Sequence, residues 1–455
     1  MTRSAALAPP QTAAAPRWPW LLLLAVLLAI GAGAALDRLR GAGDASLDPT
    51  TIEPGYGPKT FAEAVARAER DVAGARESYA YARDEWLRGE ALARALIARW
   101  RLAGDYADLA EADRLLEAGL DTTPDPAGPV LSKAVLAVLV HRLDEADAAL
   151  ARSGRSAAPD PNETADAAAL TGDVALQRGQ LDRAAEFFAQ ADRALGTAGT
   201  GLRRAMLEGG RGEREAAMTA VEALVARPRQ QPATLAALML QRANLAYAAG
   251  DWAEAGRWVG AAQRAFPGWW LADAYAAQQF ALAGRTNEAI RAYGIVAART
   301  GRPEVMDALA HLLRLQGRGA ESRAWAAKAA ASWAERAALF PEAVAHHRAE
   351  HELAVGSASR ALALAQADAK VRPHAPNLVL LARALLSAGR PREALAALDR
   401  ADAQGWVSAS QAMARAEVAA ALGDTAASQA ARAKALAINP RAADPRARLI
   451  WFGHD

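Results

Sequence analysis

Glycines recur at intervals close to 34 residues, and this spacing constrains the fold more than any other feature of the sequence. The clearest series is Gly250, Gly284, Gly317, Gly356, Gly389 and Gly423, with successive spacings of 34, 33, 39, 33 and 34. Earlier members of the series are Gly104, Gly179 and Gly212, with Arg142 in the turn between the first two. A period of this size is typical of a solenoid, in which each repeat buries its apolar face against its neighbours.

Small and helix-ending residues stand at fixed distances from these glycines. Five residues later the sequence has Ala184, Ala255, Ala289, Ala361 and Ala394, and twelve later it has Ala191, Ala262, Ala401 and Ala435. Seventeen residues later it has Pro267, Pro373 and Pro440. A glycine permits the left-handed backbone of a tight helix exit, a small side chain lets two helices approach closely, and proline ends a helix. The pattern predicts nine or ten helix pairs between about residues 80 and 440.

The composition fits a helical protein and excludes several other classes. The chain has 455 residues, of which 52% are hydrophobic and 6% aromatic, and this apolar fraction excludes intrinsic disorder as a class. There is no cysteine, which removes disulfides, thiol nucleophiles and cysteine-ligated zinc. The 53 basic and 51 acidic residues leave a net charge of +2, so no bulk field is directed at nucleic acid.

The segment from Trp18 to Leu36 contains no charged residue. A helix of this length spans about 30 Å, the thickness of a bilayer core, so residues 18–36 are predicted to be a transmembrane signal anchor. A second interpretation stays open: the triplet Ala32-Gly33-Ala34 is an A-x-A cleavage pattern, as in a secretory signal peptide. Both interpretations place the rest of the chain in a bacterial-type periplasm, either attached to the inner membrane or soluble.

The orientation across a membrane is only weakly encoded, because Arg3 and Arg17 precede the apolar segment while Arg38 and Arg40 follow it. The reverse orientation, with a cytoplasmic body, therefore stays open. The expected organisation is a polar segment (1–17), the anchor or signal peptide (18–36), a Gly- and Pro-rich flexible linker (37–58), a repeat domain (59–445) and a C-terminal tail (446–455).

The repeat units resemble those of the tetratricopeptide repeat family. The clearest unit is residues 244–255, Asn-Leu-Ala-Tyr-Ala-Ala-Gly-Asp-Trp-Ala-Glu-Ala, which closes at Ala265-Phe266-Pro267; similar phrases occupy 281–289, 384–394 and 419–440. The resemblance implies an all-α, right-handed α-solenoid of about nine to ten helix pairs, here preceded by one N-terminal hydrophobic helix. It also implies a concave groove, lined by the first helix of each pair, that docks a protein or peptide partner.

Counting six residues back from each turn glycine selects the groove positions. The selected residues are Asp173, Asn244, Gln278, His311, Glu350, Arg383 and Glu417, and Tyr247, Tyr275 and Arg314 lie on neighbouring positions. All ten are candidate partner-binding residues, because a ladder of hydrogen-bonding groups would grip an extended or helical segment. The alternative is that each helix simply needs a solvated stripe, on which adjacent polar side chains bond one another.

Four of the twelve tryptophans cluster within one unit and its exit: Trp252, Trp258, Trp269 and Trp270. Tryptophan is a good interface anchor. In an alanine-rich solenoid it more often fills the gaps left by small neighbours, and core packing is the interpretation we favour.

The stretch from His346 to Glu352 contains an H-x-x-E-H pattern formed by His347, Glu350 and His351. On a helix the two histidines lie one turn apart and could bind zinc while the glutamate activates water. The downstream glutamates Glu393 and Glu417 belong to separate repeats, and the glycine register assigns His351 to a buried position. Ordinary packing is therefore expected, with no metal or other cofactor.

The sequence predicts a non-catalytic scaffold or adaptor at the bacterial cell envelope, attached through residues 18–36, that binds a protein or peptide in its groove. No nucleic acid or small-molecule substrate is expected. One alternative is an accessory factor in cytochrome c maturation or in polysaccharide or protein secretion, which would hold extended client chains. Another is a zinc hydrolase using His347, Glu350 and His351.

Overall fold

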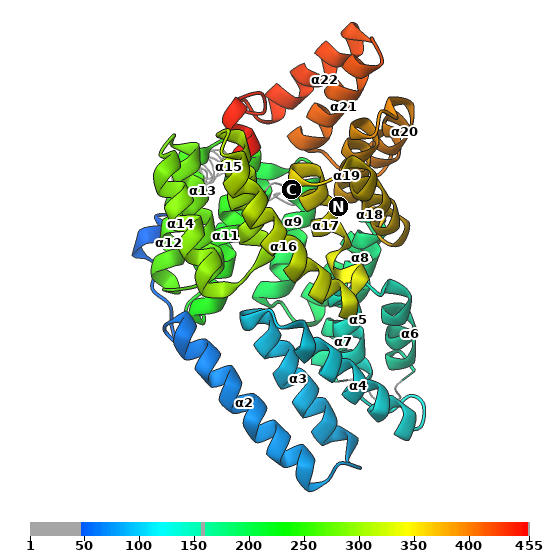
Figure 1. The fold of residues 1–455 in the computed structure, drawn as a ribbon. Helices are drawn as coiled ribbons and strands as arrows, with labels where there is room; N and C mark the ends of the chain where they lie inside the picture. Colours follow the sequence, from blue (N-terminus) through cyan, green and yellow to red (C-terminus); the bar gives the residue numbers. More distant parts are fainter. Residues whose placement is uncertain (1–46, 156–159, 454–455) are drawn as a thin grey trace, which may run out of the picture. The chain divides into compact units, whose positions relative to one another are not determined.

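The computed structural model describes residues 47–155 and 160–453, and within them the chain is all-α, with 21 α-helices, two short 3-10 helices and no strand (Figure 1). The helices lie within one compact unit, residues 49–455. The first half contains η1 (Pro49–Thr51), α2 (Phe61–Tyr81), α3 (Trp86–Ala103), α4 (Tyr106–Thr122), α5 (Val130–Leu139), α6 (Leu143–Ser153), α7 (Pro161–Gln177), α8 (Leu181–Ala194), α9 (Ala198–Gly210), α10 (Arg214–Val225) and α11 (Pro232–Ala249). The second half contains α12 (Trp252–Ala265), α13 (Trp270–Leu282), α14 (Thr286–Thr300), α15 (Pro303–Leu315), α16 (Gly319–Leu339), α17 (Pro341–Val355), α18 (Ala358–Val371), α19 (Ala375–Ser387), α20 (Pro391–Asp402), α21 (Ala409–Ala421), α22 (Thr425–Ile438) and η2 (Pro445–Leu449).

The helices from α3 to α22 pack as ten consecutive pairs, and α2 packs on α3. Each odd-numbered helix makes its most extensive contact with the even-numbered helix that follows it, and successive pairs stack on one another along the chain (Figure 1). Within the part of the chain that is described, this confirms the helical solenoid and the predicted number of pairs.

The turn glycines take the left-handed backbone that their spacing predicts, with φ of 75° at Gly104, 80° at Gly250 and 73° at Gly317, for example. Two predicted turns differ. Gly356, at the long spacing of 39, has φ −115° and ends α17 without a left-handed residue. In the early turn assigned to Arg142, the left-handed residue is His141, with φ 62°. Arg142 instead donates its backbone N–H to Ala137 and becomes the N-cap of α6.

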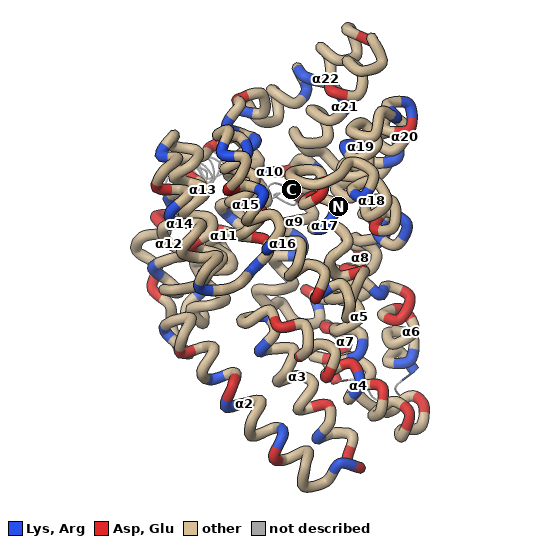
Figure 2. The backbone as a smooth tube through the Cα atoms, in the orientation of Figure 1, with Lys and Arg blue, Asp and Glu red and all other residues tan. Residues whose placement is uncertain are grey.

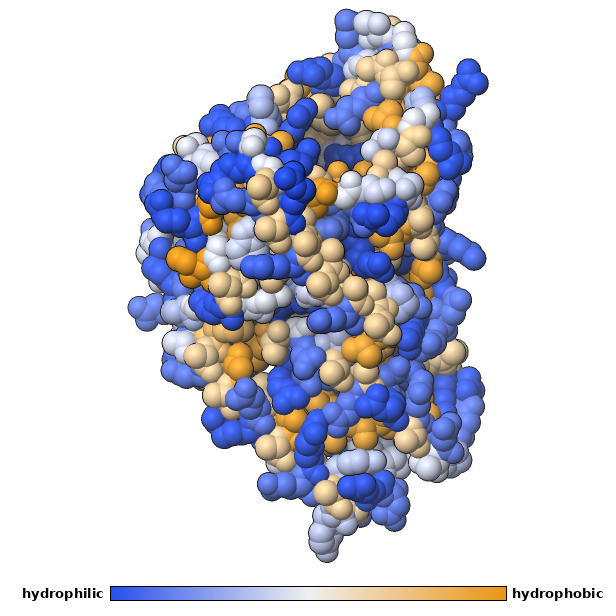
Figure 3. Space-filling model, in the orientation of Figure 1, coloured by the Kyte–Doolittle hydropathy of each residue, from blue (hydrophilic) through white to orange (hydrophobic). Residues whose placement is uncertain are grey.

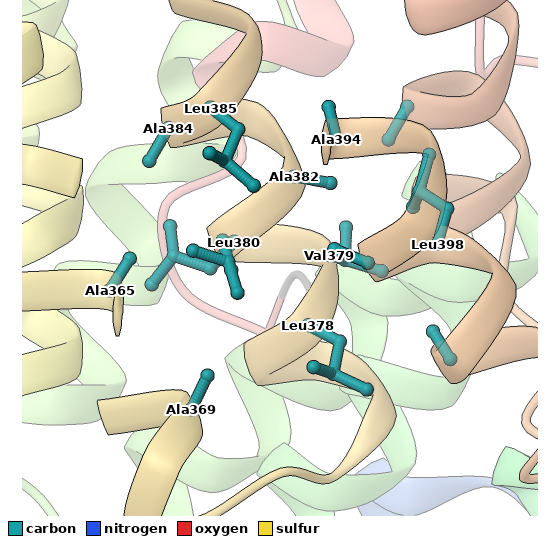
Figure 4. Close-up of a cluster of buried hydrophobic side chains, with 14 of the residues drawn as sticks. Ala365, Ala369, Leu378, Val379, Leu380, Ala382, Ala384, Leu385, Ala394 and Leu398 are labelled. Carbon is teal, nitrogen blue, oxygen red and sulfur yellow. The ribbon is translucent and has the colours of Figure 1, made fainter. Parts of the chain in front are cut away.

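The alanines at the two fixed positions lie at the closest helix–helix contacts. All nine, Ala184, Ala255, Ala289, Ala361, Ala394, Ala191, Ala262, Ala401 and Ala435, are 0% exposed. In the cluster shown in Figure 4, Ala394 packs beside Ala382 and Leu398 where α19 meets α20. A larger side chain would force the paired helices apart, which explains why small residues recur there.

Segments far apart in sequence also meet within this unit. Arg302 donates to the carbonyl oxygen of Leu102 at 2.9 Å, and Phe340 packs into the apolar core formed mainly by α2 to α5. In the α20–α21 loop, Val407 donates its backbone N–H to the carbonyl oxygen of Gly210 at 2.8 Å. Early and late repeats are therefore in direct contact.

The segments flanking the helix pairs pack against them. Of the expected linker, η1 lies against α12, and Gly55 donates its backbone N–H to the carbonyl oxygen of Gln230 at 2.7 Å. After α22 the chain turns back, and η2 lies against α13 and α15 (Figure 1). The predicted anchor at residues 18–36 lies outside the described residues. Among the helices that are described, none is both long and apolar enough to cross a bilayer.

Candidate functional site

The first helices of three neighbouring pairs, α11, α13 and α15, bring together five of the predicted groove residues. We name this set the tail-binding surface: Asn244, Tyr247, Tyr275, Gln278 and His311. The Tyr275 hydroxyl donates to Asn244 Oδ1 at 2.8 Å, and the rings of Tyr247 and Tyr275 lie 6.1 Å apart. Burial raises the pKa of Tyr247 to about 12 and that of Tyr275 further, so both hydroxyls stay neutral at physiological pH. The surface is therefore a fixed hydrogen-bonding face of neutral groups.

The chain's own C-terminal segment, residues 439–453, lies on this surface. Gln278 is 0% exposed and binds the segment through its backbone. Its Oε1 accepts the N–H groups of Trp451 at 2.7 Å and Phe452 at 2.9 Å, while its Nε2 donates to the Phe452 carbonyl oxygen at 3.0 Å. A side-chain amide that pairs with backbone groups in this way recognises the path of the chain, here a bend at residues 452 and 453, rather than its side chains.

We name the pairing of Gln278 with the backbone of residues 451 and 452 the backbone clamp, and aromatic contacts surround it. The Phe452 ring lies 5.6 Å from the Tyr275 ring and 6.4 Å from the Tyr293 ring, and Phe452 is 8% exposed. The Trp451 ring lies 5.5 Å from the His311 ring. Contacts of this kind stabilise by about 0.5–1.5 kcal/mol beyond the area they bury.

His311 also binds the backbone of the segment, since its Nε2 lies 2.9 Å from the carbonyl oxygen of Arg448. Burial lowers the pKa of His311 and keeps its ring neutral. In a neutral ring the nitrogen that faces a carbonyl oxygen carries the proton, so Nε2 donates here.

Upstream, the segment is held by Trp252 and by backbone carbonyls. The guanidinium groups of Arg441 and Arg446 lie 4.7 and 5.2 Å from the Trp252 ring centroid. Arg446 also donates to the carbonyl oxygen of Leu282 at 3.2 Å, and Asn439 Nδ2 donates to that of Tyr247 at 3.3 Å. The segment is thus anchored along its length.

The tryptophan cluster packs mainly into the solenoid, as favoured from the sequence. Trp252, Trp258 and Trp270 are 7%, 0% and 9% exposed, and Trp269 is half-buried. Trp252 has both roles, because the same ring packs in the interior and carries two arginines of the C-terminal segment.

A cavity of about 230 Å³ adjoins the docked segment, lined by Trp270, Leu271, Glu304, His347, Glu350, Trp451 and Phe452. It is the place where Glu350, another predicted groove residue, comes close to the segment. Arg336 donates to Glu304 Oε1 at 2.8 Å; burial raises the pKa of Glu304, but Arg336, Arg302 and His347 together outweigh it and lower that pKa. The cavity therefore carries negative charge beside its aromatic walls.

Of the other predicted groove residues, Arg314 lies on α15, and Asp173, Arg383 and Glu417 lie on other helices. None of these four contacts the segment through any hydrogen bond or ion pair described. Asp173 forms a two-pronged ion pair with Arg203, at 2.8 Å to Arg203 Nε. Arg383 donates to Ser410 at 2.8 Å. Arg314 and Glu417 are exposed. Asp173 and Arg383 therefore bond to polar side chains of neighbouring helices, as expected if each helix simply carries a solvated polar stripe.

In the H-x-x-E-H pattern, His347 and Glu350 contact each other, whereas His351 points toward Asp307. His351 is buried, as the register predicts, with Nδ1 2.5 Å from Asp307 Oδ1. His347 is exposed, stacks on Trp333 and lies 3.1 Å from Glu350 Oε2. Among residues 47–155 and 160–453, no three His, Asp or Glu side chains come together as a metal site would require.

A charged cluster beside this pattern was not predicted. His346 lies 3.3 Å from Asp368 and 3.6 Å from Glu350. Burial lowers the pKa of His346, but the two carboxylates outweigh it and raise the pKa to about 10. Asp368 is buried and also binds Arg372 at 2.7 Å; its pKa is lowered because its partners outweigh its burial. The cluster joins α17 to α18 as a structural ion-pair network.

The repeat pattern assigns no role to the C-terminal segment. Its signal is present in the printed sequence: the apolar run Leu449-Ile450-Trp451-Phe452 follows Arg446 and Arg448 in a stretch that is otherwise polar. Two adjacent aromatic residues beyond the last repeat indicate a segment that packs somewhere. The surface on which it packs follows only from the fold.

Comparisons with known proteins give structural likenesses alone. No protein-family model and no curated protein matches the sequence. Among solved structures, the APC/C hetero-tetramer Cut9-Hcn1 matches at 15% identity and TM-score 0.42, over 92% of this chain and 81% of that one. Yeast Tom70 matches at 12% and 0.40, over 83% and 88%. A tetratricopeptide repeat protein from Parabacteroides merdae matches at 11% and 0.26, over 61% and 93%. These values assign no partner and no activity to this chain.

Proposed function

We propose that this protein is a non-catalytic scaffold that docks an extended segment of a partner protein on the tail-binding surface. The observation that carries the proposal is the pairing of the Gln278 side-chain amide with the backbone of residues 451 and 452. A buried amide that has lost its water needs such partners, and the backbone of a peptide that follows the same path provides them.

The side chains of the tail-binding surface are bonded to one another. Gln279 Nε2 donates to the Tyr247 hydroxyl at 2.7 Å, and Tyr275 donates to Asn244, so these side chains hold one another in place. A preorganised surface loses little conformational entropy on binding, which raises affinity for a given contact area.

The remaining surface offers weaker grounds for docking. On the face shown in Figure 3, apolar side chains form small separate groups among polar ones. Basic and acidic residues are interspersed along the helices (Figure 2), so a partner is not selected by one sign of charge. Exposed large hydrophobic residues such as Tyr81 and Ile295 lie on different helices, far apart in sequence.

We also propose that this scaffold lies at the bacterial inner membrane, tethered through residues 18–36 with its repeats in the periplasm. It is supported by the 19 uncharged residues from Trp18 to Leu36. Cleavage after Ala34 would instead release a soluble periplasmic protein. Alkaline phosphatase fused after residue 455 tests the location, because it is active only outside the cytoplasm; an inactive, stably expressed fusion would contradict the periplasmic proposal.

A holder of extended client chains, as in cytochrome c maturation or export, is the second candidate function. The same backbone clamp favours it, because a side-chain amide that pairs with backbone alone accepts many sequences. A scaffold with one partner and a client holder differ in selectivity: the first prefers one sequence and the second binds many with similar affinity.

The experiment uses the full chain carrying Trp451→Ala and Phe452→Ala, which weakens the docked segment and which we name the opened chain. Random peptides are selected on it by display, and their affinities are measured by titration calorimetry. We expect enriched peptides whose affinity falls roughly tenfold or more when Gln278→Leu is added, because the hydrogen bonds lost each contribute about 1 kcal/mol.

Glu417→Leu in the opened chain is the matched control, because Glu417 occupies the same register position on α21 and is itself exposed. It should leave the affinities unchanged. A selection without enriched peptides, or peptides insensitive to Gln278→Leu, would overturn the proposed function. Circular dichroism must show equal helix content in all variants.

A further inference from the structure

The tail-binding surface recognises the side chains of the docked segment as well as the backbone that Gln278 binds. Gln278 fixes the register, and in that register the Phe452 ring enters a slot between Tyr275 and Tyr293. Tyr293 is 1% exposed, so the end of the slot is closed by the interior of the protein. A flat aromatic side chain fits between two rings, whereas a short aliphatic or charged one would leave the slot unfilled.

The residue after the aromatic side chain must be glycine. Gly453 has φ 73°, a conformation that other residues adopt only with strain. A Cβ atom at this position would lie 2.1 Å from Asn244 Oδ1 and 3.1 Å from the Tyr275 hydroxyl. Asn244 and Tyr275 are bonded to each other at 2.8 Å, so neither can withdraw without breaking that bond.

The protein also recognises a cationic side chain of the segment, Arg446, at a second position formed by Trp252 and Leu282. The Arg446 guanidinium lies 5.2 Å from the Trp252 ring centroid and donates to the Leu282 carbonyl oxygen at 3.2 Å. Leu282 is the last residue of α13, where the exposed carbonyl end of the helix dipole also favours a cation. The distance along the segment from Arg446 to Trp451 is therefore part of what the surface recognises.

Most of the segment lies at the protein surface: Arg441, Pro445, Arg446 and Arg448 are exposed, and Phe452 is its one buried large apolar residue. Such a segment can be exchanged without unfolding the helix pairs. Being covalently attached, it competes with any incoming peptide at a high effective concentration, on the order of millimolar.

We infer that the partner carries a segment of the same chemistry as residues 446–453: an arginine, four residues of any kind, two aromatic residues and a glycine. The inference rests on the proposed function. The chain's own segment is then an internal competitor that the partner segment displaces. A second copy of this chain, exchanging its segment, is the rival occupant and an outcome of the test.

The test measures fluorescence polarisation of a labelled peptide with the sequence of residues 444–453, Asp-Pro-Arg-Ala-Arg-Leu-Ile-Trp-Phe-Gly. The full wild-type chain and the opened chain are compared. We expect the opened chain to bind the peptide at least about tenfold more tightly, because its surface is no longer occupied. Equal affinity for both chains, or no binding to the opened chain, would overturn the inference.

Variant peptides test the selectivity. Replacements in the peptide corresponding to Phe452→Ala, Gly453→Val and Arg446→Ala should each weaken binding, the first two by about tenfold or more. Replacement of Leu449, which lies between the anchor points, by Ala is the matched control and should have little effect. A Gly453→Val peptide that binds as tightly as the original would contradict the required glycine.

A second opened variant guards against misfolding. If Trp451→Ala and Phe452→Ala together reduce the helix content of the chain, the full chain carrying only Gly453→Val takes its place. Size-exclusion chromatography with light scattering checks for segment exchange: a wild-type dimer that Gly453→Val converts to monomer would favour a second copy as the occupant and overturn the partner assignment.

The two proposals fail in different ways. Display peptides that depend on Gln278 but lack the aromatic and glycine residues would leave the docking function standing and overturn this inference. An opened chain that enriches no peptide and does not bind the 444–453 peptide would overturn both.

Discussion

Gln278 and Phe452, 174 residues apart in sequence, pair through two hydrogen bonds: the glutamine Nε2 donates to the Phe452 carbonyl oxygen and its Oε1 accepts the Phe452 N–H. The side-chain amide thereby acts toward Phe452 as a neighbouring β-strand would. The Gln278 side chain is fully buried, and its hydrogen-bonding groups are thus paired by a segment that lies outside the helix pairs. This pair defines the candidate site and ties it to the C-terminal segment.

Replacing Gln278 by leucine should release the end of the segment. The amides of Trp451 and Phe452 lose their acceptor, so local opening becomes easier by about 1–2 kcal/mol. Hydrogen exchange followed by mass spectrometry should show residues 446–453 exchanging roughly tenfold faster or more, with the helix pairs unchanged. Glu417→Leu serves as the control. Unaltered exchange in this segment would show that the clamp does not hold it.

Gly250→Ala should destabilise the protein more than Gly317→Ala. Both glycines have left-handed backbone, with φ 80° and 73°, so both substitutions cost about 1 kcal/mol of strain. At Gly250 the new Cβ would also lie 2.3 Å from Asn439 Oδ1, whereas at Gly317 no atom lies within 4 Å. The difference, of about 1 kcal/mol or more, should appear as a lower urea midpoint for Gly250→Ala. Equal midpoints would mean that the Asn439 contact adjusts without cost.

Asp307→Ala should be strongly destabilising, because the Asp307 carboxylate accepts from two buried groups. Trp333 Nε1 lies 2.7 Å from Oδ2 and His351 Nδ1 lies 2.5 Å from Oδ1, so the substitution leaves both without a partner. We expect a loss of about 3–5 kcal/mol in the free energy of unfolding. Trp333→Phe removes only one donor and keeps most of the apolar volume, so it should cost less, about 1–2 kcal/mol. The reverse order in thermal denaturation would refute this account of the network.

The stabilising effect of His346 should depend on pH. Its pKa is about 10 in the folded protein, against 6.5 ordinarily, so the native state binds the extra proton between these values. The contribution is therefore complete below about pH 6.5 and is lost as the pH rises toward 10. His346→Leu should destabilise by about 3 kcal/mol at pH 6 and by much less near pH 10. A wild-type-minus-variant difference that does not change over this range would contradict the raised pKa.

Ala289→Leu should destabilise the α13–α14 pair. Ala289 is 0% exposed at a helix crossing, and three added carbon atoms would overpack it at a cost of about 1–3 kcal/mol. Ala298→Leu lies on the exposed side of the same helix, α14, and should change stability by less than about 0.5 kcal/mol. Urea denaturation of the two variants compares them directly. Similar midpoints would show that the alanine positions are not close contacts.

Regular spacing made the repeats predictable. The left-handed turn at Gly250, the zero exposure of Ala255 and Ala262, and the end of α12 just before Pro267 all follow from local rules acting within one unit. The same counting failed at Gly356 and at Arg142. His141 takes the left-handed position there, which the glycine rule does not anticipate.

The candidate site could be predicted only in part. The register named Asn244, Tyr247, Tyr275, Gln278 and His311, which the fold brings together. It equally named Asp173, Arg383 and Glu417, which lie on other repeats. Apart from Tyr247 and Tyr275, which lie on neighbouring positions, these residues share one position within their own unit. That position carries no information about which units a distant segment covers.

What the sequence by itself determined is the helix pair, because turn geometry, small-residue contacts and helix ends depend on neighbours a few residues away. Tertiary structure alone decided that early repeats meet late ones through Arg302 and Leu102, and that the chain past α22 returns to α11, α13 and α15. The small rotation between successive repeats accumulates over ten pairs. The 34-residue period does not reveal the total rotation, and it is this total rotation that places Phe452 beside Gln278.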